Sequence, residues 1–188
     1  MGPVAKGFEM TRSVRIVLTG VETTGKTTLS KELAAHFGGA VLPEYGRTWA
    51  ETRGTDFTMA ALRAIADGHL AMRAALEATQ PALIIEDTDI VMTSAWAIML
   101  HGKRDPILSA IPASGDLYLL FRPDIPWIDD GTRMFGGDMR TRFHTVVKEE
   151  LAIRRIMPVI IEGDRAQRRA TAIAAIDAML ADQKPISR

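Results

Sequence analysis

The 188-residue sequence contains no cysteine, which excludes a disulfide, a zinc–thiolate site and a catalytic thiol. It also lacks any run of about 18 apolar residues, the length that a membrane-spanning helix needs. The first residues have no long apolar stretch of the kind found in a secretory signal. We therefore expect a cytoplasmic protein with no membrane partner.

Neither sign of charge dominates the chain. Lysine and arginine together number 23, as do aspartate and glutamate, so the formal net charge is zero. A neutral chain without a basic stripe argues against nucleic acid as a partner. A small anion needs only a local cradle of amides and one lysine. We expect a small-molecule partner, and the sequence leaves open whether the chain forms a homo-oligomer.

Short apolar runs alternate with longer segments of helical period, without an internal repeat or a linker. This alternation predicts an α/β fold with a parallel sheet covered by helices. We expect one domain at residues 12–182, preceded by a flexible lead-in or expression remnant at 1–11 and followed by a tail at 183–188. The expected strands are 14–18, 40–42, 81–87, 116–121 and 158–162, and the expected helices are 25–37, 56–78, 90–101, one ending near 154, and 166–181.

The most specific pattern lies between the first expected strand and the first expected helix. It reads Gly-Val-Glu-Thr-Thr-Gly-Lys-Thr and matches the phosphate-binding loop, or P-loop. The glycines let backbone amides turn toward phosphates, the lysine places a charge beside them, and the final threonine can bind Mg²⁺. We therefore expect ATP and Mg²⁺ as cofactors, with phosphate contacts from Gly20, Glu22, Thr23, Thr24, Gly25, Lys26, Thr27 and Thr28.

Acidic residues stand at the ends of the second and third expected strands, beside this loop. Asp87 is placed like the acid that orients Mg²⁺, so Thr27 and Asp87 are the expected metal ligands. Glu44 is placed to accept a proton from an acceptor hydroxyl, a role that Asp87 could also take. Either carboxylate could instead cap a helix or pair with a surface arginine. Asp89 is either a helix N-cap or a substrate ligand.

The segment 129–140 is rich in glycine and carries spaced arginines. Such a segment can close over the phosphates and exclude water, or it can be a solvated turn. Arg133 is the preferred cationic residue of this short lid, and Arg140 is the second choice. The loop, the strands and this segment together predict a three-layer P-loop NTPase fold with a five-stranded parallel sheet flanked by helices and a short Arg-bearing lid.

Aromatic residues make up only 6% of the chain. Tyr45, Trp49 and Trp127 are expected at strand exits or in loops, where they could hold a flat or cationic ring or simply pack. Trp96 is expected in the core.

The chain has no guanine-reading Asn-Lys-x-Asp motif and little room for an additional helical lid domain. These absences argue against a GTPase switch and a remodelling ATPase. A small kinase requires an acceptor pocket, a base and a cationic lid, and the sequence offers a candidate for each. The alternative is a regulatory ATPase or switch that acts through a protein partner.

Five stretches, taken in order, resemble the nicotinamide riboside kinase domain of bacterial NadR-like proteins. They include Pro-Glu-Tyr-Gly-Arg, Glu-Asp-Thr-Asp, and Pro-Asp-Ile-Pro-Trp followed by Asp-Gly-Thr-Arg. The last of these is much more particular to the family than the phosphate loop is, and the five stretches together cover roughly residues 12–180. They are residues 16–27, 43–47, 86–89, 116–133, and the C-terminal strand and helix.

This resemblance implies transfer of the ATP γ-phosphate to the 5′-hydroxyl of nicotinamide riboside, which gives nicotinamide mononucleotide for NAD salvage. It implies that Lys26 and Thr27 handle phosphates and Mg²⁺ and that Asp87 lies near the metal and the acceptor. Tyr45 and Trp127 would border the nicotinamide ring, and Arg133 would belong to the lid. The expected catalytic residues are thus Lys26, Asp87, Glu44 and Arg133, and the expected substrate-binding residues are Glu44, Tyr45, Arg47, Asp87, Asp89, Trp127 and Arg133.

Overall fold

A parallel sheet forms the centre of the molecule, whose computed structural model describes residues 12–127 and 134–182. Within these residues five strands form one sheet in the order β2-β3-β1-β4-β5. The central strand β1 pairs with β3 and β4, so that Leu18 lies opposite both Asp87 and Leu119. After β1 the chain forms β2 and β3 on one side of β1 and then crosses to form β4 and β5 on the other side. The strand order therefore reverses at β1, and open parallel sheets bind ligands at such a switch point. The strands are β1 (Val14–Thr19), β2 (Ala40–Leu42), β3 (Leu83–Asp87), β4 (Leu117–Phe121) and β5 (Val159–Ile161).

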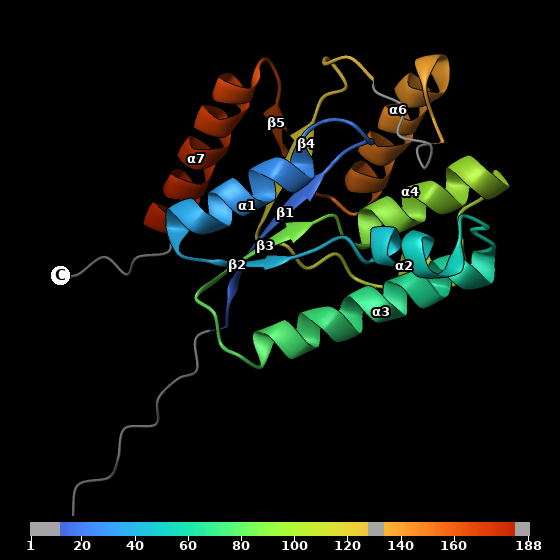
Figure 1. Cartoon of the computed structure of the whole chain (residues 1–188), viewed down its shortest axis with the longest axis horizontal. Coiled ribbons are helices and arrows are strands. Elements are labelled where there is room, and N and C mark those ends of the chain that lie inside the picture. Colours follow the sequence, from blue (N-terminus) through green and yellow to red (C-terminus); the bar gives the residue numbers. More distant parts are fainter. Residues whose placement is uncertain (1–11, 128–133, 183–188) are drawn as a thin grey trace, which may run out of the picture.

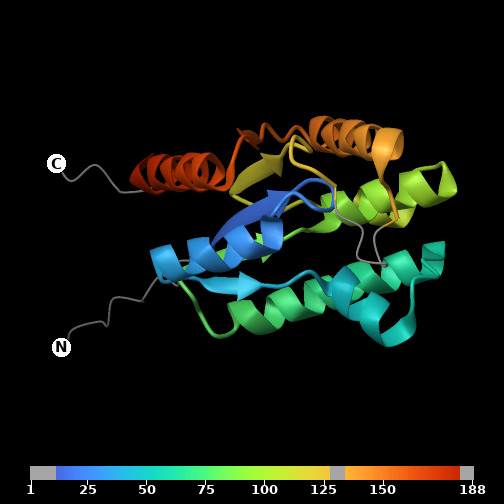
Figure 2. The same cartoon turned by 45° about the horizontal axis from the view of Figure 1, so that its top comes forward.

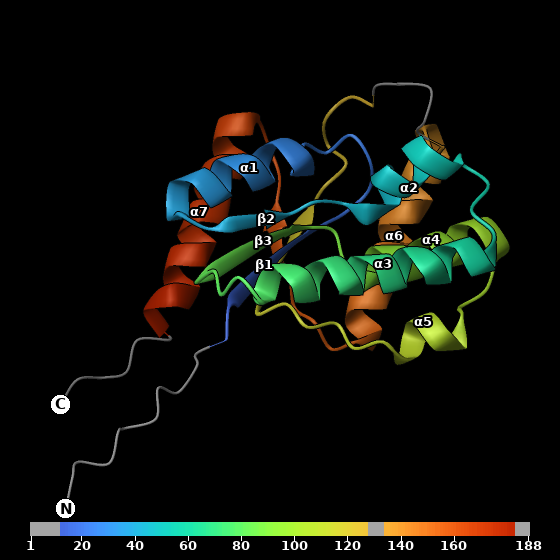
Figure 3. The same ribbon diagram turned by 60° about the horizontal axis from the view of Figure 1, so that its bottom comes forward.

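Helices cover both faces of the sheet and give three layers (Figures 1 and 3). α1 and α7 pack on one face, and α4 and α6 pack on the other with α3 beside α4. No helix in the described part of the chain is long and apolar enough to span a bilayer. The helices are α1 (Lys26–Phe37), α2 (Tyr45–Arg53), α3 (Met59–Glu77), α4 (Ile90–His101), α5 (Pro106–Ala110), α6 (Gly137–Ile153) and α7 (Arg165–Asp182).

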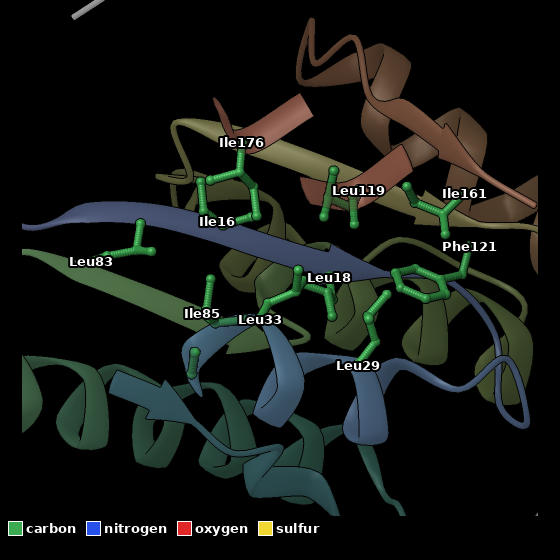
Figure 4. Packing of buried hydrophobic residues seen from close by; sticks show 12 residues of the cluster. Ile16, Leu18, Leu29, Leu33, Leu83, Ile85, Leu119, Phe121, Ile161 and Ile176 are labelled. Atoms are coloured by element: carbon green, nitrogen blue, oxygen red, sulfur yellow. The ribbon is translucent and has the colours of Figure 1, made fainter. Parts of the chain in front are cut away.

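Alternating side chains of β1 enter two separate cores. Ile16 and Leu18 face α1 and α7, where Leu33 packs against them (Figure 4), whereas Val17 faces α4 and α6. All four side chains are completely buried. Fully burying one such side chain stabilises the fold by about 1.5–3 kcal/mol. The two cores therefore hold β1 rigidly, and β1 in turn fixes the loop that follows it.

Shortening a core side chain of α1 tests this packing. Leu33→Ala removes a fully buried side chain, so the free energy of unfolding should fall by about 3 kcal/mol in urea titrations. The control is Lys31→Ala on the exposed side of the same helix, where the change should stay within about 0.5 kcal/mol. Equal effects of the two substitutions would contradict the packing described here.

The predicted five-stranded parallel sheet and its flanking helices are confirmed. Two short helices, α2 and α5, were not predicted. Helix α2 buries none of its residues and its N-cap side chain makes no capping bond, so neither periodicity nor capping marks it in the sequence. The helix expected to begin at 56 starts at Met59, with the Thr58 side chain as its cap. α6 begins at Gly137, inside the segment predicted as a lid.

Candidate active site

The connection from β1 to α1 curls tightly at the carboxyl edge of the sheet. Its φ angles are positive at Gly20 (128°), Thr23 (58°) and Gly25 (86°), a conformation that glycine adopts easily and threonine does not. A Cβ on Gly20 would lie 2.7 Å from the carbonyl oxygen of Phe121, so only glycine fits there. The connection ends at the N-terminus of α1, where free amides and the helix dipole favour an anion. The backbone therefore has the features of a phosphate-binding loop.

Three side chains meet beside this loop. The Lys26 ammonium donates to the carbonyl oxygen of Val21 at 2.8 Å. The Thr27 hydroxyl donates to Oδ2 of Asp87 at 2.5 Å, while the other Asp87 oxygen, Oδ1, is buried without a partner among the described residues. A hydroxyl and a carboxylate side by side fit Mg²⁺, which typically takes one or two protein oxygens and completes its shell with phosphates and water. Thr27 and Asp87 can thus hold the metal, and the unsatisfied Oδ1 supports this.

Carboxylates surround the Lys26 ammonium. Burial lowers the pKa of Lys26, and the charges of Asp87, Glu44 and Glu22 oppose that shift. Loss of solvent contact raises the pKa of Glu44; Asp87 adds to the shift, and Lys26 opposes it. The Glu44 side chain still keeps 29% of its exposure. Lys26 therefore shares the site with a buried carboxylate, Asp87, and with a partly exposed carboxylate, Glu44.

A cavity of about 440 Å³ extends from the loop toward α2, α3 and α4. α2 lies against α3 just beyond the end of β2 (Figures 2 and 3). The side of the cavity away from the loop is lined by acidic, aromatic and aliphatic side chains. A space of this size and mixed lining suits a small organic ligand placed next to phosphates. The loop residues predicted for phosphate contact all line it, namely Gly20, Glu22, Thr23, Thr24, Gly25, Lys26, Thr27 and Thr28.

The predicted acceptor-side residues fall into three groups. Glu44, Tyr45, Arg47 and Asp89 line the cavity. Asp87 lies beneath Thr27 and reaches the site through that hydroxyl. Trp127 does not line the cavity; its ring packs on Gly136, where an added Cβ would come within 3.4 Å of it. Arg133 lies outside the described residues.

Asp89 is the N-cap of α4, one of the two roles left open by the sequence. Its Oδ1 accepts a bond from the amide of Val91 at 3.0 Å, and its Oδ2 accepts one from the Tyr118 hydroxyl at 2.6 Å. Burial raises the pKa of Asp89 to about 6, against the effect of the Tyr118 bond. The preceding residue, Thr88, has a positive φ of 71° and also lines the cavity. The capping bond to Val91 thus fixes the Asp89 carboxyl in place, and the residue still lines the cavity.

Several cavity residues were missed in the sequence. Trp96, expected in the core, does pack against Phe57 and Phe143, but it also lines the cavity. His69 of α3 lines it as well, with its Nε2 3.4 Å from the buried carboxylate of Glu86. The signal available in the sequence was positional. Helices that follow β2 and β3 extend over the carboxyl edge of the sheet, so polar or aromatic residues in them become site candidates.

One aromatic residue and one arginine were placed wrongly. Trp49 was expected in a loop or at a strand exit but lies within α2, whereas Tyr45, the first residue of α2, does lie just past the end of β2. Trp49 packs with the cluster between α3 and α4, and the Arg53 guanidinium lies over its ring. Arg140, the second lid candidate, is 7% exposed in α6 and donates to backbone carbonyls. The two errors have different causes. Helix α2 buries none of its residues and therefore reads as a loop, whereas Arg140 lies near the start of α6, shortly after glycines that suggest a lid.

Comparison with known proteins places this geometry in a family. Residues 15–168 match the family described as AAA domain. The chain is 28% identical over 179 residues to the trifunctional NAD biosynthesis/regulator protein NadR of Escherichia coli (strain K12). The aligned region covers 90% of this chain and 43% of the relative. The chain thus spans less than half the length of that relative.

Solved structures agree. A crystal structure of NadR in complex with NR is 25% identical, with a TM-score of 0.78, over 95% of this chain and 55% of that one. The thymidylate kinase of Ehrlichia chaffeensis shares the fold at a TM-score of 0.63 and 15% identity, over 90% of this chain and all of that enzyme. The chain therefore belongs to this AAA domain family, has the fold of P-loop kinases, and is a homologue of the NadR proteins.

Proposed function

We propose that the protein is an ATP- and Mg²⁺-dependent kinase that transfers the γ-phosphate to the 5′-hydroxyl of nicotinamide riboside or a closely related nucleoside. The observation that carries the proposal is the cavity in which the phosphate loop faces a wall of carboxylates and aromatic rings. A nucleotide-hydrolysing switch does not need a pocket for an acceptor beside the loop, whereas a kinase does. The NadR relative seen with NR supports the choice of acceptor.

The donor would bind along the loop. Loop amides and the Lys26 ammonium would hold the β- and γ-phosphates, and Thr27 and Asp87 would hold Mg²⁺, which offsets phosphate charge when bound. Lys26 already lies within the loop, where its ammonium bonds to Val21. A phosphate oxygen would replace that carbonyl as its partner. Such positioning and charge stabilisation supply most of the catalysis in phosphoryl transfer.

The acceptor hydroxyl would then attack. A bond forms between its oxygen and the γ-phosphorus, the bond from that phosphorus to the bridging oxygen of ADP breaks, and the hydroxyl proton passes to a carboxylate. Glu44 is suited to receive it because loss of solvent contact raises its pKa, which makes its carboxylate more basic. Asp87 is the alternative base, since its Oδ1 has no partner in the described part of the chain.

The remaining wall would hold the nucleoside. Tyr45 and Trp96 offer aromatic faces to a flat ring, and a ring that carries positive charge gains most from such faces and from nearby carboxylates. Arg47 and Asp89 would contact the ribose or the base. Trp127 and Arg133 stay part of this proposal as a ring contact and a lid residue brought in when ligands bind.

Shortening one aromatic residue of the wall tests the acceptor half. Trp96→Leu should raise KM for the nucleoside about tenfold, because base–aromatic stacking contributes about 1–3 kcal/mol, and should leave KM for ATP within twofold, about 0.4 kcal/mol. The matched control is Trp49→Leu, a half-buried tryptophan that packs against the same hydrophobic cluster as Trp96 but does not line the cavity. Steady-state kinetics with each substrate varied would measure both. Equal effects on both Michaelis constants would contradict the assignment of Trp96.

The activity itself is tested with Mg-ATP and a panel of nucleosides. ADP release should depend on the nucleoside, and kcat/KM should be highest for nicotinamide riboside. Release of ADP at one rate whatever nucleoside is present would overturn the proposal. It would favour instead a regulatory ATPase that acts through a protein partner.

A further inference from the structure

Every backbone carbonyl from Val21 to Gly25 has a hydrogen-bond donor. Val21 accepts from Lys26 and from the Thr24 hydroxyl, and Gly25 accepts from the first turn of α1. The three carbonyls between them accept from two arginines that come from distant parts of the chain. These bonds decide which way the peptide groups of the loop face.

Arg140 of α6 supplies two of these bonds. Its Nη2 lies 3.2 Å from the carbonyl oxygen of Thr23 and 3.4 Å from that of Glu22. Its Nη1 donates to Ile125 at 2.8 Å, in the segment that follows β4. One guanidinium therefore ties the phosphate loop to that segment.

Arg168 of α7 supplies the third. Its Nη1 lies 3.3 Å from the carbonyl oxygen of Thr24, its Nε donates to Gly163 at 2.7 Å, and its Nη2 bonds to Asp124. Arg140 and Arg168 are 7% and 4% exposed, and neither lines the cavity. Both charges thus lie behind the loop, away from the ligand.

A peptide group is planar, so its carbonyl and the following amide point in opposite directions. Carbonyls of residues 22–24 that are held against the arginines turn the amides of Thr23, Thr24 and Gly25 the other way. Thr23 has the left-handed φ of 58°, which a β-branched residue adopts only when its surroundings impose it. The bond from Arg140 to the Thr23 carbonyl is positioned to impose it.

We infer that Arg140 and Arg168 are positioning residues for the phosphate donor. They hold the loop in its anion-binding conformation before the donor arrives, and they add positive potential behind it. The inference rests on phosphate binding by the loop, the donor half of the proposed function, and is independent of the acceptor.

The test compares phosphate affinity with stability. Calorimetry with inorganic tripolyphosphate should give a Kd about tenfold weaker for Arg140→Gln and for Arg168→Gln, because hydrogen bonds to charged groups contribute about 1.5–3 kcal/mol each. The matched control is Arg154→Gln, at the end of α6. Its side chain is also largely buried, at 10% exposure, and its guanidinium also bonds to carbonyls, those of Ile111 and Leu108, but not to those of the loop. The Kd of Arg154→Gln for tripolyphosphate should stay within twofold of the native value, about 0.4 kcal/mol, even if the variant is less stable and unfolds at a lower urea concentration.

A purely structural role predicts the opposite pattern. Unchanged tripolyphosphate affinity in folded Arg140→Gln or Arg168→Gln, or an equal loss in Arg154→Gln, would overturn the inference. If a glutamine variant does not fold, the lysine variant replaces it. Lysine keeps the charge but loses the forked donors, so its Kd should still weaken severalfold, and an unchanged Kd would overturn the inference. Arginine-dependent binding without transfer to any nucleoside would instead refute the proposed function alone.

Discussion

Lys26→Ala should lower kcat/KM by about a thousandfold, the upper range seen when one preorganised donor to a developing negative charge is removed. Lys26 is the cation inside the loop, and Asp87, Glu44 and Glu22 surround it. Its ammonium is buried at a cost, since burial lowers its pKa. The free energy of unfolding should therefore change by no more than about 1 kcal/mol. A coupled assay for ADP with a parallel urea titration measures both quantities.

Two further variants make this result interpretable. Lys26→Met keeps the apolar stem without the charge and should lose as much activity as Lys26→Ala. Lys31→Ala removes an exposed lysine from the same helix and should retain full activity. Activity within tenfold of the native protein in Lys26→Met would show that the charge inside the loop does not drive the reaction.

Asp87→Asn should lower kcat about a hundredfold or more and raise the Mg²⁺ concentration needed for half-maximal rate. The amide oxygen can still accept the bond from Thr27, so the geometry is kept while the charge is lost. The carboxylate is 1% exposed, and one of its oxygens lacks a partner in the described structure. Neutralising the carboxylate should therefore not reduce stability. Magnesium titrations of the rate would measure the loss of metal binding, and thermal melts of the same variant would show that the fold is kept.

Glu44→Gln distinguishes the two candidate bases. If Glu44 receives the proton, its glutamine variant should lose kcat about a hundredfold, the lower range for a general base, with an unchanged magnesium requirement. If Asp87 is the base, Glu44→Gln should chiefly raise the KM for the nucleoside, because Glu44 lines the cavity. An unchanged kcat and KM would remove Glu44 from the site altogether.

The donor half of the site was predictable because its information is local. The glycines and Lys26 lie within one short stretch, and Asp87 is the last residue of a strand whose apolar run is unmistakable. Parallel strands bring their carboxyl ends to one edge, so a motif at the end of β1 and an acid at the end of β3 had to meet. The register between Leu18 and Asp87 brings them together.

The acceptor wall and the arginine pair depend on tertiary placement. Trp96 lies in an apolar helix, and nothing in the neighbouring sequence shows that its side chain lines a cavity. Arg140 looked like a lid residue because it follows glycines, whereas two of its partners, Glu22 and Thr23, lie more than a hundred residues earlier, in the phosphate loop. Bonds from a side chain to distant carbonyls leave no pattern in the sequence.

Phosphorus NMR of one reaction mixture tests the central claim most directly. With Mg-ATP and nicotinamide riboside, ADP and a 5′-phosphomonoester of the riboside should accumulate in equal amounts, with little inorganic phosphate. Without the riboside, ATP should remain almost intact. Inorganic phosphate forming at the same rate with and without the riboside, and no phosphomonoester, would contradict the account.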